Sequence, residues 1–153
     1  MQPLIDLAYR TRRRAMALVG WRTSGVKVMA FDPAGRLLLV RHRYGRSDLW
    51  MLPGGAIGRG ESPDAAAVRE LAEETGCALV AIAAIGVFAA HAEGRRDTVH
   101  LFRGTTADLP QVDGVELAEA RFIALDELPK TVSPATLRRI AEWRGERVAG
   151  PHW

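Results

Sequence analysis

The segment GGAIGRGESPDAAAVRELAEETGC, residues 54–77, constrains the fold of this chain more than any other. Ser62 is a favourable N-cap and Pro63 fits the first turn of a helix. Gly76 can adopt the left-handed conformation that ends one. The sequence therefore predicts a helix from Pro63 to Thr75, preceded by a glycine-rich loop that lets the backbone approach a ligand closely.

The predicted helix carries three carboxylates, Glu70, Glu73 and Glu74, within an arc of about 100°. Like charges at these spacings repel by a few tenths of a kcal/mol per pair, and within the helix only Arg69 can compensate. A solvated acidic face is the simplest alternative, but a bound cation would relieve the repulsion. Mg²⁺ or Mn²⁺, which prefer oxygen ligands, are therefore expected on this face. The neighbouring arc is expected to pack on a sheet and contains Ala67, Val68, Leu71 and Thr75.

The rest of the chain alternates between strand-like and helix-like segments. Residues 25–44 predict a β-hairpin whose turn contains Asp, Pro and Gly at residues 32–35. This pattern indicates an α/β domain with a mixed β-sheet between helices. Further strands are predicted at residues 80–92, 97–107 and 119–125, and a terminal helix begins at Ser133 and Pro134.

Length and composition indicate one domain over residues 1–153, of which 48% are hydrophobic. Residues 1–20 predict an N-terminal amphipathic helix that serves packing or self-association, so a homodimer is possible. Its arginines are not interleaved with aromatic residues, so no nucleic acid partner is expected. No apolar run approaches the ~18 residues of a membrane span, and a cytoplasmic protein is expected. The single cysteine, Cys77, is expected to be a small buried residue.

The charged residues of the central segment follow a fixed spacing that begins at Gly55 and Glu61 and continues with Arg69-Glu70-Leu71, Glu73-Glu74 and Gly76. This spacing resembles the Nudix box, G-x5-E-x7-R-E-U-x-E-E-x-G-U, in which U is a bulky aliphatic residue, over residues 55–77. Every charged and glycine position matches, and only Cys77 departs from the pattern. LWMLPGG before the box and EARFIALDELP after it extend the resemblance from about residue 25 to the C-terminus.

The resemblance implies a Nudix-type α/β/α sandwich and a magnesium-dependent hydrolase that cleaves a nucleoside diphosphate linked to another moiety. Arg69, Glu70 and Glu73 would be catalytic, with Glu70 as the general base and Arg69 holding a box glutamate. Glu61 would orient the helix. Glu116 and Glu119, outside the box, are alternatives for the base or for an extra metal ligand, although exposed glutamates are the simpler interpretation. The metal ligands would be Glu70, Glu73, Glu74 and a backbone carbonyl of Gly54 or Gly55.

The substrate is expected to be a small-molecule nucleotide: a nucleotide sugar, an ADP-ribose-like compound, a dinucleotide or a nucleoside triphosphate. Tyr44 and Trp50 flank a loop and could stack a base, although packing of the tryptophan on the sheet is equally compatible. The alternatives are a non-catalytic Nudix-fold sensor domain and, less favoured, a Nudix-fold isomerase. Candidate substrate-binding residues are Arg41, Arg43, Tyr44 and Arg96, the last in an expected loop with His91 and Arg95.

Overall fold

The computed structural model describes residues 24–92 and 95–153. The helix predicted at residues 1–20 lies outside this part of the chain. The helices are α2 (Pro63–Thr75) and α3 (Pro134–Trp143), and the strands are β1 (Ser24–Phe31), β2 (Leu37–His42), β3 (Trp50–Met51), β4 (Gly54–Ala56), β5 (Val80–Ala92), β6 (Arg95–Thr105) and β7 (Leu117–Ile123).

The strands form a single mixed sheet in the order β3-β2-β1-β6-β5, with β7 beside β2 and β4 beside β1. β1 and β6 run parallel, whereas the other pairs are antiparallel. The predicted hairpin turns between Phe31 and Leu37, which are paired. Asp32 holds this turn by accepting hydrogen bonds from the backbone N–H groups of Ala34 and Arg36.

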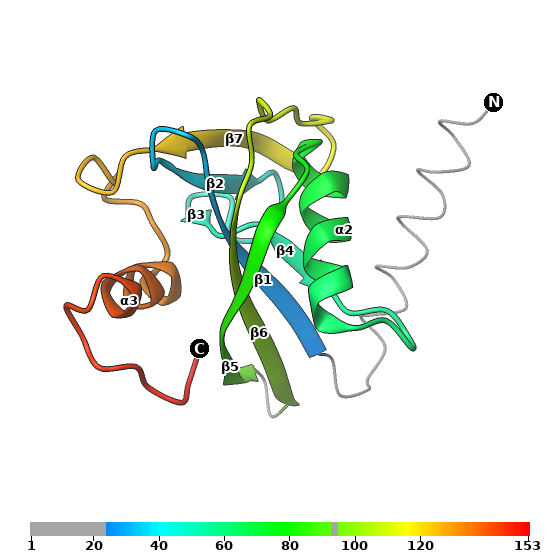
Figure 1. Cartoon of the computed structure of the whole chain (residues 1–153), viewed down its shortest axis with the longest axis vertical. Helices are drawn as coiled ribbons and strands as arrows, with labels where there is room; N and C mark the ends of the chain where they lie inside the picture. Colours follow the sequence, from blue (N-terminus) through cyan, green and yellow to red (C-terminus); the bar gives the residue numbers. More distant parts are fainter. Residues whose placement is uncertain (1–23, 93–94) are drawn as a thin grey trace.

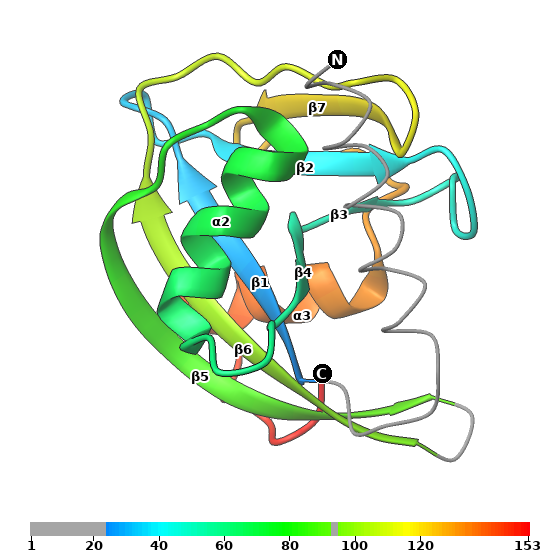
Figure 2. The same cartoon turned by 90° about the vertical axis from the view of Figure 1, so that its right-hand side faces the viewer.

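One described helix covers each face of the sheet, which confirms the predicted sandwich (Figure 1). The core beneath α2 contains Val28 and Leu71. The core beneath α3 contains Met29 and Ile140. Val28 and Met29 point to opposite faces because successive residues of a strand alternate. Figure 2 shows α2 in front of the sheet, α3 behind it, and the short strand β4 beside β1.

The ends of α2 are those that the sequence predicts. The hydroxyl of Ser62 accepts a hydrogen bond from the Ala65 N–H at 3.4 Å, and Gly76 has a φ of 73°. The buried arc differs by one position from the expectation. Val68 is exposed, and Ala66 is buried beside Ala67 and Leu71 in its place. The alanines allow α2 to lie close to the sheet.

The strand predicted at residues 80–92 matches β5, but the loop predicted around His91, Arg95 and Arg96 is wrong. β5 extends to Ala92 and β6 begins at Arg95, with His91 paired opposite Arg96. The sequence missed only the first residues of β6, because Arg95 and Arg96 lack the apolar alternation that marks a strand. Two short strands, β3 and β4, were also not predicted, because two or three residues carry no periodicity.

Candidate active site

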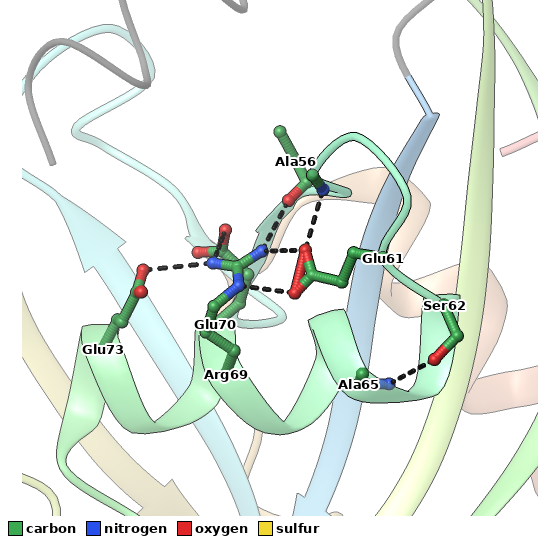
Figure 3. Close-up of polar contacts among 8 residues, drawn as sticks. Ala56, Glu61, Ser62, Ala65, Arg69, Glu70 and Glu73 are labelled. Carbon is green, nitrogen blue, oxygen red and sulfur yellow. Dashed lines mark hydrogen bonds and ion pairs between the residues drawn. The ribbon is translucent and has the colours of Figure 1, made fainter. Parts of the chain in front are cut away.

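The guanidinium of Arg69 is the centre of a polar network between α2 and the preceding loop. Its Nε and Nη2 donate to the two carboxylate oxygens of Glu61 at 2.6 and 2.9 Å (Figure 3). Its Nη1 donates to Glu70 Oε1 at 2.6 Å and to Glu73 Oε2 at 3.2 Å. Nη2 also donates to the carbonyl of Ala56 at 2.9 Å. The ion pair expected between Arg69 and the box glutamates is therefore present.

This network compensates the like charges of the helix. The hydrogen bonds with Glu61 are the main cause that raises the pKa of Arg69, and Glu70 and Glu73 raise it further, while burial opposes them. Arg69 stays charged, and its planar fork suits the bidentate contact with Glu61. Glu61 is fixed in turn, because the Gly58 N–H donates to its Oε2 at 2.8 Å. Glu61 thus connects the loop to the helix.

Gly54 and Gly55 place backbone directly against the carboxylates of α2. The Gly54 N–H donates to Glu74 Oε2 at 3.0 Å. A Cβ on Gly55 would lie 2.4 Å from Glu70 Oε2, so only glycine allows this approach. Glu70 is 4% exposed and Glu74 8% exposed, so both carboxylates are buried against this loop. Carboxylate oxygens and loop backbone therefore share one small region.

These groups fit a hard divalent cation by chemical type, since they are carboxylate oxygens beside backbone carbonyls. In the part of the chain that the structure describes, however, no three Asp, Glu, His or Cys side chains are arranged as a ready cation site. The three helix carboxylates, which were expected to share one arc, have different partners. Glu70 and Glu73 bind Arg69, whereas Glu74 binds the Gly54 N–H. In this structure the positive charge beside Glu70 and Glu73 is the guanidinium of Arg69.

Comparison with known proteins shows which family this chain belongs to. A family model described as the NUDIX domain matches residues 21–143. The chain belongs to the Nudix family. It is 35% identical over 123 residues, 80% of each chain, to a Bacillus subtilis (strain 168) protein whose name marks it as a candidate 8-oxo-dGTP diphosphatase. It is 39% identical over 106 residues to a Mycobacterium tuberculosis (strain CDC 1551 / Oshkosh) protein named as a candidate mutator protein, MutT4, covering 65% of this chain and 42% of that protein.

Solved Nudix structures share the fold. A MutT NUDIX hydrolase from Burkholderia pseudomallei superposes with a TM-score of 0.68 at 28% identity, over 85% of this chain and 100% of that chain. A MutT protein from Methanosarcina mazei Go1 gives a TM-score of 0.69 at 23% identity, over 84% of this chain and 96% of that chain. The chain is a Nudix hydrolase, an enzyme acting on phosphoanhydride bonds, so the enzyme interpretation holds over the sensor alternative.

The predicted substrate residue Arg41 is held in ion pairs on the sheet. Its Nη2 pairs with Glu119 Oε1, and Arg121 binds the other oxygen of Glu119 at 2.7 Å. The hydrogen bond from Arg41, together with the charges of both arginines, lowers the pKa of Glu119 against the opposing effect of desolvation. Trp50 is buried and both guanidinium groups lie near its ring, as the packing interpretation expected. A carboxylate with a lowered pKa is a weaker proton acceptor, which disfavours Glu119 as the base.

The other candidates lie on different elements of the fold. Tyr44 is 73% exposed in the turn after β2, and the backbone N–H of Arg43 donates to the Glu116 carbonyl at 2.9 Å. Arg96 lies in β6. Their roles in substrate binding remain predictions. The sequence did not reveal the contributions of the Gly54 N–H and the Ala56 carbonyl, because backbone groups carry no residue signal.

Within residues 24–92 and 95–153, neither α2 nor α3 is long and apolar enough to cross a membrane.

Proposed function

We propose that the chain is a magnesium- or manganese-dependent pyrophosphohydrolase of nucleoside polyphosphates. The observation that carries this proposal is the burial of Glu70 and Glu74 against the Gly54-Gly55 backbone, beside the guanidinium of Arg69. Binding a nucleotide without turnover would not require carboxylates that repel one another. The complete set of charged Nudix box residues therefore favours catalysis.

Glu70, Glu73 and Glu74, with a carbonyl of Gly54 or Gly55, would hold the cation. When bound, a divalent cation neutralises pyrophosphate oxygens and lowers the pKa of a coordinated water. Arg69 would orient Glu70 and Glu73 through its Nη1 while Glu61 fixes the guanidinium. In this proposal Arg69 is a positioning residue, and the three glutamates contact the cation.

Glu70 would act as the general base. Its carboxylate takes a proton from the attacking water, whose oxygen forms a new bond to one phosphorus of the phosphoanhydride. The bond from that phosphorus to the bridging oxygen breaks, and the bridging oxygen leaves with its electron pair on the other phosphate fragment. Glu119 is less suitable for this step because an arginine binds each of its two oxygens, whereas Arg69 binds Oε1 of Glu70.

Nucleoside triphosphates are the substrate class that we favour. The support is the name of the Bacillus subtilis relative, which specifies 8-oxo-dGTP, over a match that covers 80% of both chains. Matches to proteins named RNA pyrophosphohydrolase are shorter, and one from Saccharophagus degradans (strain 2-40 / ATCC 43961 / DSM 17024) covers 40% of this chain and 36% of that protein. Nucleotide sugars, ADP-ribose and dinucleotides are the competing substrates.

The test is a panel of these four substrate classes incubated with the full chain and Mg²⁺ or Mn²⁺. Released nucleoside monophosphate, pyrophosphate and orthophosphate are measured by chromatography. We expect nucleoside triphosphates to give monophosphate and pyrophosphate, and chelator to stop the reaction. A matched variant pair, Glu74→Gln and the exposed Glu127→Gln, separates the site from a general loss of charge. Hydrolysis that persists in Glu74→Gln or in chelator would refute the metal-site assignment.

A further inference from the structure

The C-terminal segment, residues 150–153, lies along β5, where backbone hydrogen bonds hold it (Figure 1). The Ala89 N–H donates to the Pro151 carbonyl at 2.9 Å, and the Trp153 N–H donates to the Ala89 carbonyl at 2.8 Å. His152, between these two residues, is bridged to Ala89 in a parallel arrangement. Because β5 is the last strand in the order β3-β2-β1-β6-β5, the segment borders the edge of the sheet.

Side-chain contacts fix this segment on both sides of its histidine. The ring of Trp153 packs edge-on against Phe88, with 5.9 Å between the ring centroids. The Trp153 carbonyl oxygen accepts a hydrogen bond from Arg138 Nη2 at 2.8 Å. On the other side, the Gly150 N–H donates to Glu142 Oε1 at 3.1 Å. The backbone that carries the histidine therefore has a defined position on β5.

This arrangement brings the imidazole rings of His91 and His152 together. Ala89 and His91 point to the same face of β5 because every second residue of a strand does so, and the bridged His152 shares that face. Trp153, the next residue, points to the opposite face, where it meets Phe88. The centroids of the two imidazole rings are 5.6 Å apart, and the rings are inclined at 58°. Both histidines are exposed to solvent.

The distance between the rings matches two imidazoles that bind one metal ion. An imidazole nitrogen lies about 2.0–2.1 Å from Zn²⁺, so the ring centres of two imidazoles on one tetrahedral ion are roughly 5–5.5 Å apart. Imidazole suits Zn²⁺, Cu²⁺ and Ni²⁺, whereas Mg²⁺ and Mn²⁺ prefer oxygen ligands. Two histidines at an exposed position leave the other coordination positions of the ion to water. The pair thus differs in chemistry from the carboxylates of α2.

We propose that His91 and His152 together bind one transition-metal ion, Cu²⁺ or Zn²⁺, which ties the C-terminal segment to β5. The site is independent of the proposed hydrolysis, whose cation would bind the carboxylates of α2. The ion stabilises the arrangement in which the segment lies on β5, because only there are both rings within reach of one ion. Cu²⁺ should bind most tightly and Mn²⁺ most weakly, in the order usual for nitrogen ligands.

Calorimetry of the full chain with Cu²⁺ or Zn²⁺, in an excess of Mg²⁺ that occupies oxygen sites, tests this assignment. We expect one ion per chain, with binding weakened at least tenfold in His91→Gln and in His152→Gln. The matched control is His100→Gln, because His100 lies four residues along β6 from Arg96, the partner of His91, or roughly 13 Å away. Electron paramagnetic resonance of the Cu²⁺-loaded wild type should show two nitrogen ligands, and each variant of the pair should show fewer.

Melting temperatures test the link between the ion and the C-terminal segment. Zn²⁺ should raise the melting temperature of the wild type and of His100→Gln, but not that of His91→Gln or His152→Gln. Glu74→Gln should keep the full Zn²⁺ affinity, so this site and the proposed magnesium site can fail separately. The inference is overturned if either variant of the pair binds Cu²⁺ as tightly as the wild type. It is also overturned if sedimentation shows that one ion joins two chains in a dimer.

Discussion

Replacing Arg69 with Lys should destabilise the protein and disorder the carboxylates of α2. Arg69 donates five hydrogen bonds to Glu61, Glu70, Glu73 and the Ala56 carbonyl. An ammonium has three donors, so at least two charge-assisted bonds are lost, each worth ~1.5–3 kcal/mol. Because the Arg69 side chain is 22% exposed, we discount this sum for solvent screening. The expected loss is about 2–4 kcal/mol, or about 5–15 °C in melting temperature for a chain of this size.

Urea and thermal unfolding of Arg69→Lys, with and without Mg²⁺, measure this loss. The control is Arg46→Lys, because Arg46 is exposed and its pair with Asp48 is 3.7 Å long. A surface pair of this kind contributes ~0–1 kcal/mol. A cycle with Glu61→Gln should be non-additive, since both changes break the same bidentate contact. Equal melting temperatures for Arg69→Lys and Arg46→Lys would refute the view that Arg69 organises the network.

Four further outcomes are expected. Glu74→Gln should remain folded and lose turnover about 100-fold, on the order of 3 kcal/mol in the barrier, which steady-state kinetics at saturating Mg²⁺ would measure. Mg²⁺ or Mn²⁺ should raise the melting temperature with increasing concentration and chelator should reverse it, whereas an unchanged midpoint in calorimetry would count against a cation site. Glu142→Gln leaves Arg139, whose side chain is 1% exposed, as an uncompensated buried charge and should cost about 3–5 kcal/mol in urea unfolding. Arg41 and Arg121 lower the pKa of Glu119, so the ionised carboxylate stabilises the folded protein above its ordinary pKa, and this stability is lost as the pH falls through the lowered value. In Glu119→Gln the free energy of unfolding, measured in urea between neutral and acidic pH, should therefore fall less with decreasing pH than in the wild type.

The sequence predicted α2 to the residue because local chemistry determines its ends. Ser62, Pro63 and Gly76 act within one turn of where they stand, so their effect can be read without the tertiary structure. The strands β3 and β4 depend on pairing partners distant in sequence, such as Val26 opposite Gly55. Their two or three residues contain no pattern, and only the sheet makes them strands. The same limit explains the start of β6, where Arg95 and Arg96 are paired with β5 but carry no apolar alternation.

Much of the candidate site could be predicted because the spacing of the box residues is itself a pattern. The spacing does not predict which group each carboxylate binds. On a bare helix Glu70, Glu73 and Glu74 share an arc, yet the loop above them offers different partners to each. Arg69 binds Glu70 and Glu73, and Gly54 binds Glu74. The conformation of the loop decides these contacts, and that conformation depends on the pairing of β4 with β1.

The two glycines of that loop have different physical reasons for being glycine. Gly54 has a φ of 155°, and a Cβ there would lie 2.0 Å from the Val26 carbonyl oxygen. Gly55 does not have a positive φ, but a Cβ there would lie 2.4 Å from Glu70 Oε2. Gly54 is therefore required by the sheet and Gly55 by the carboxylate. A side chain at position 55 would displace the Glu70 carboxylate, and that constrains this position although its backbone does not require glycine.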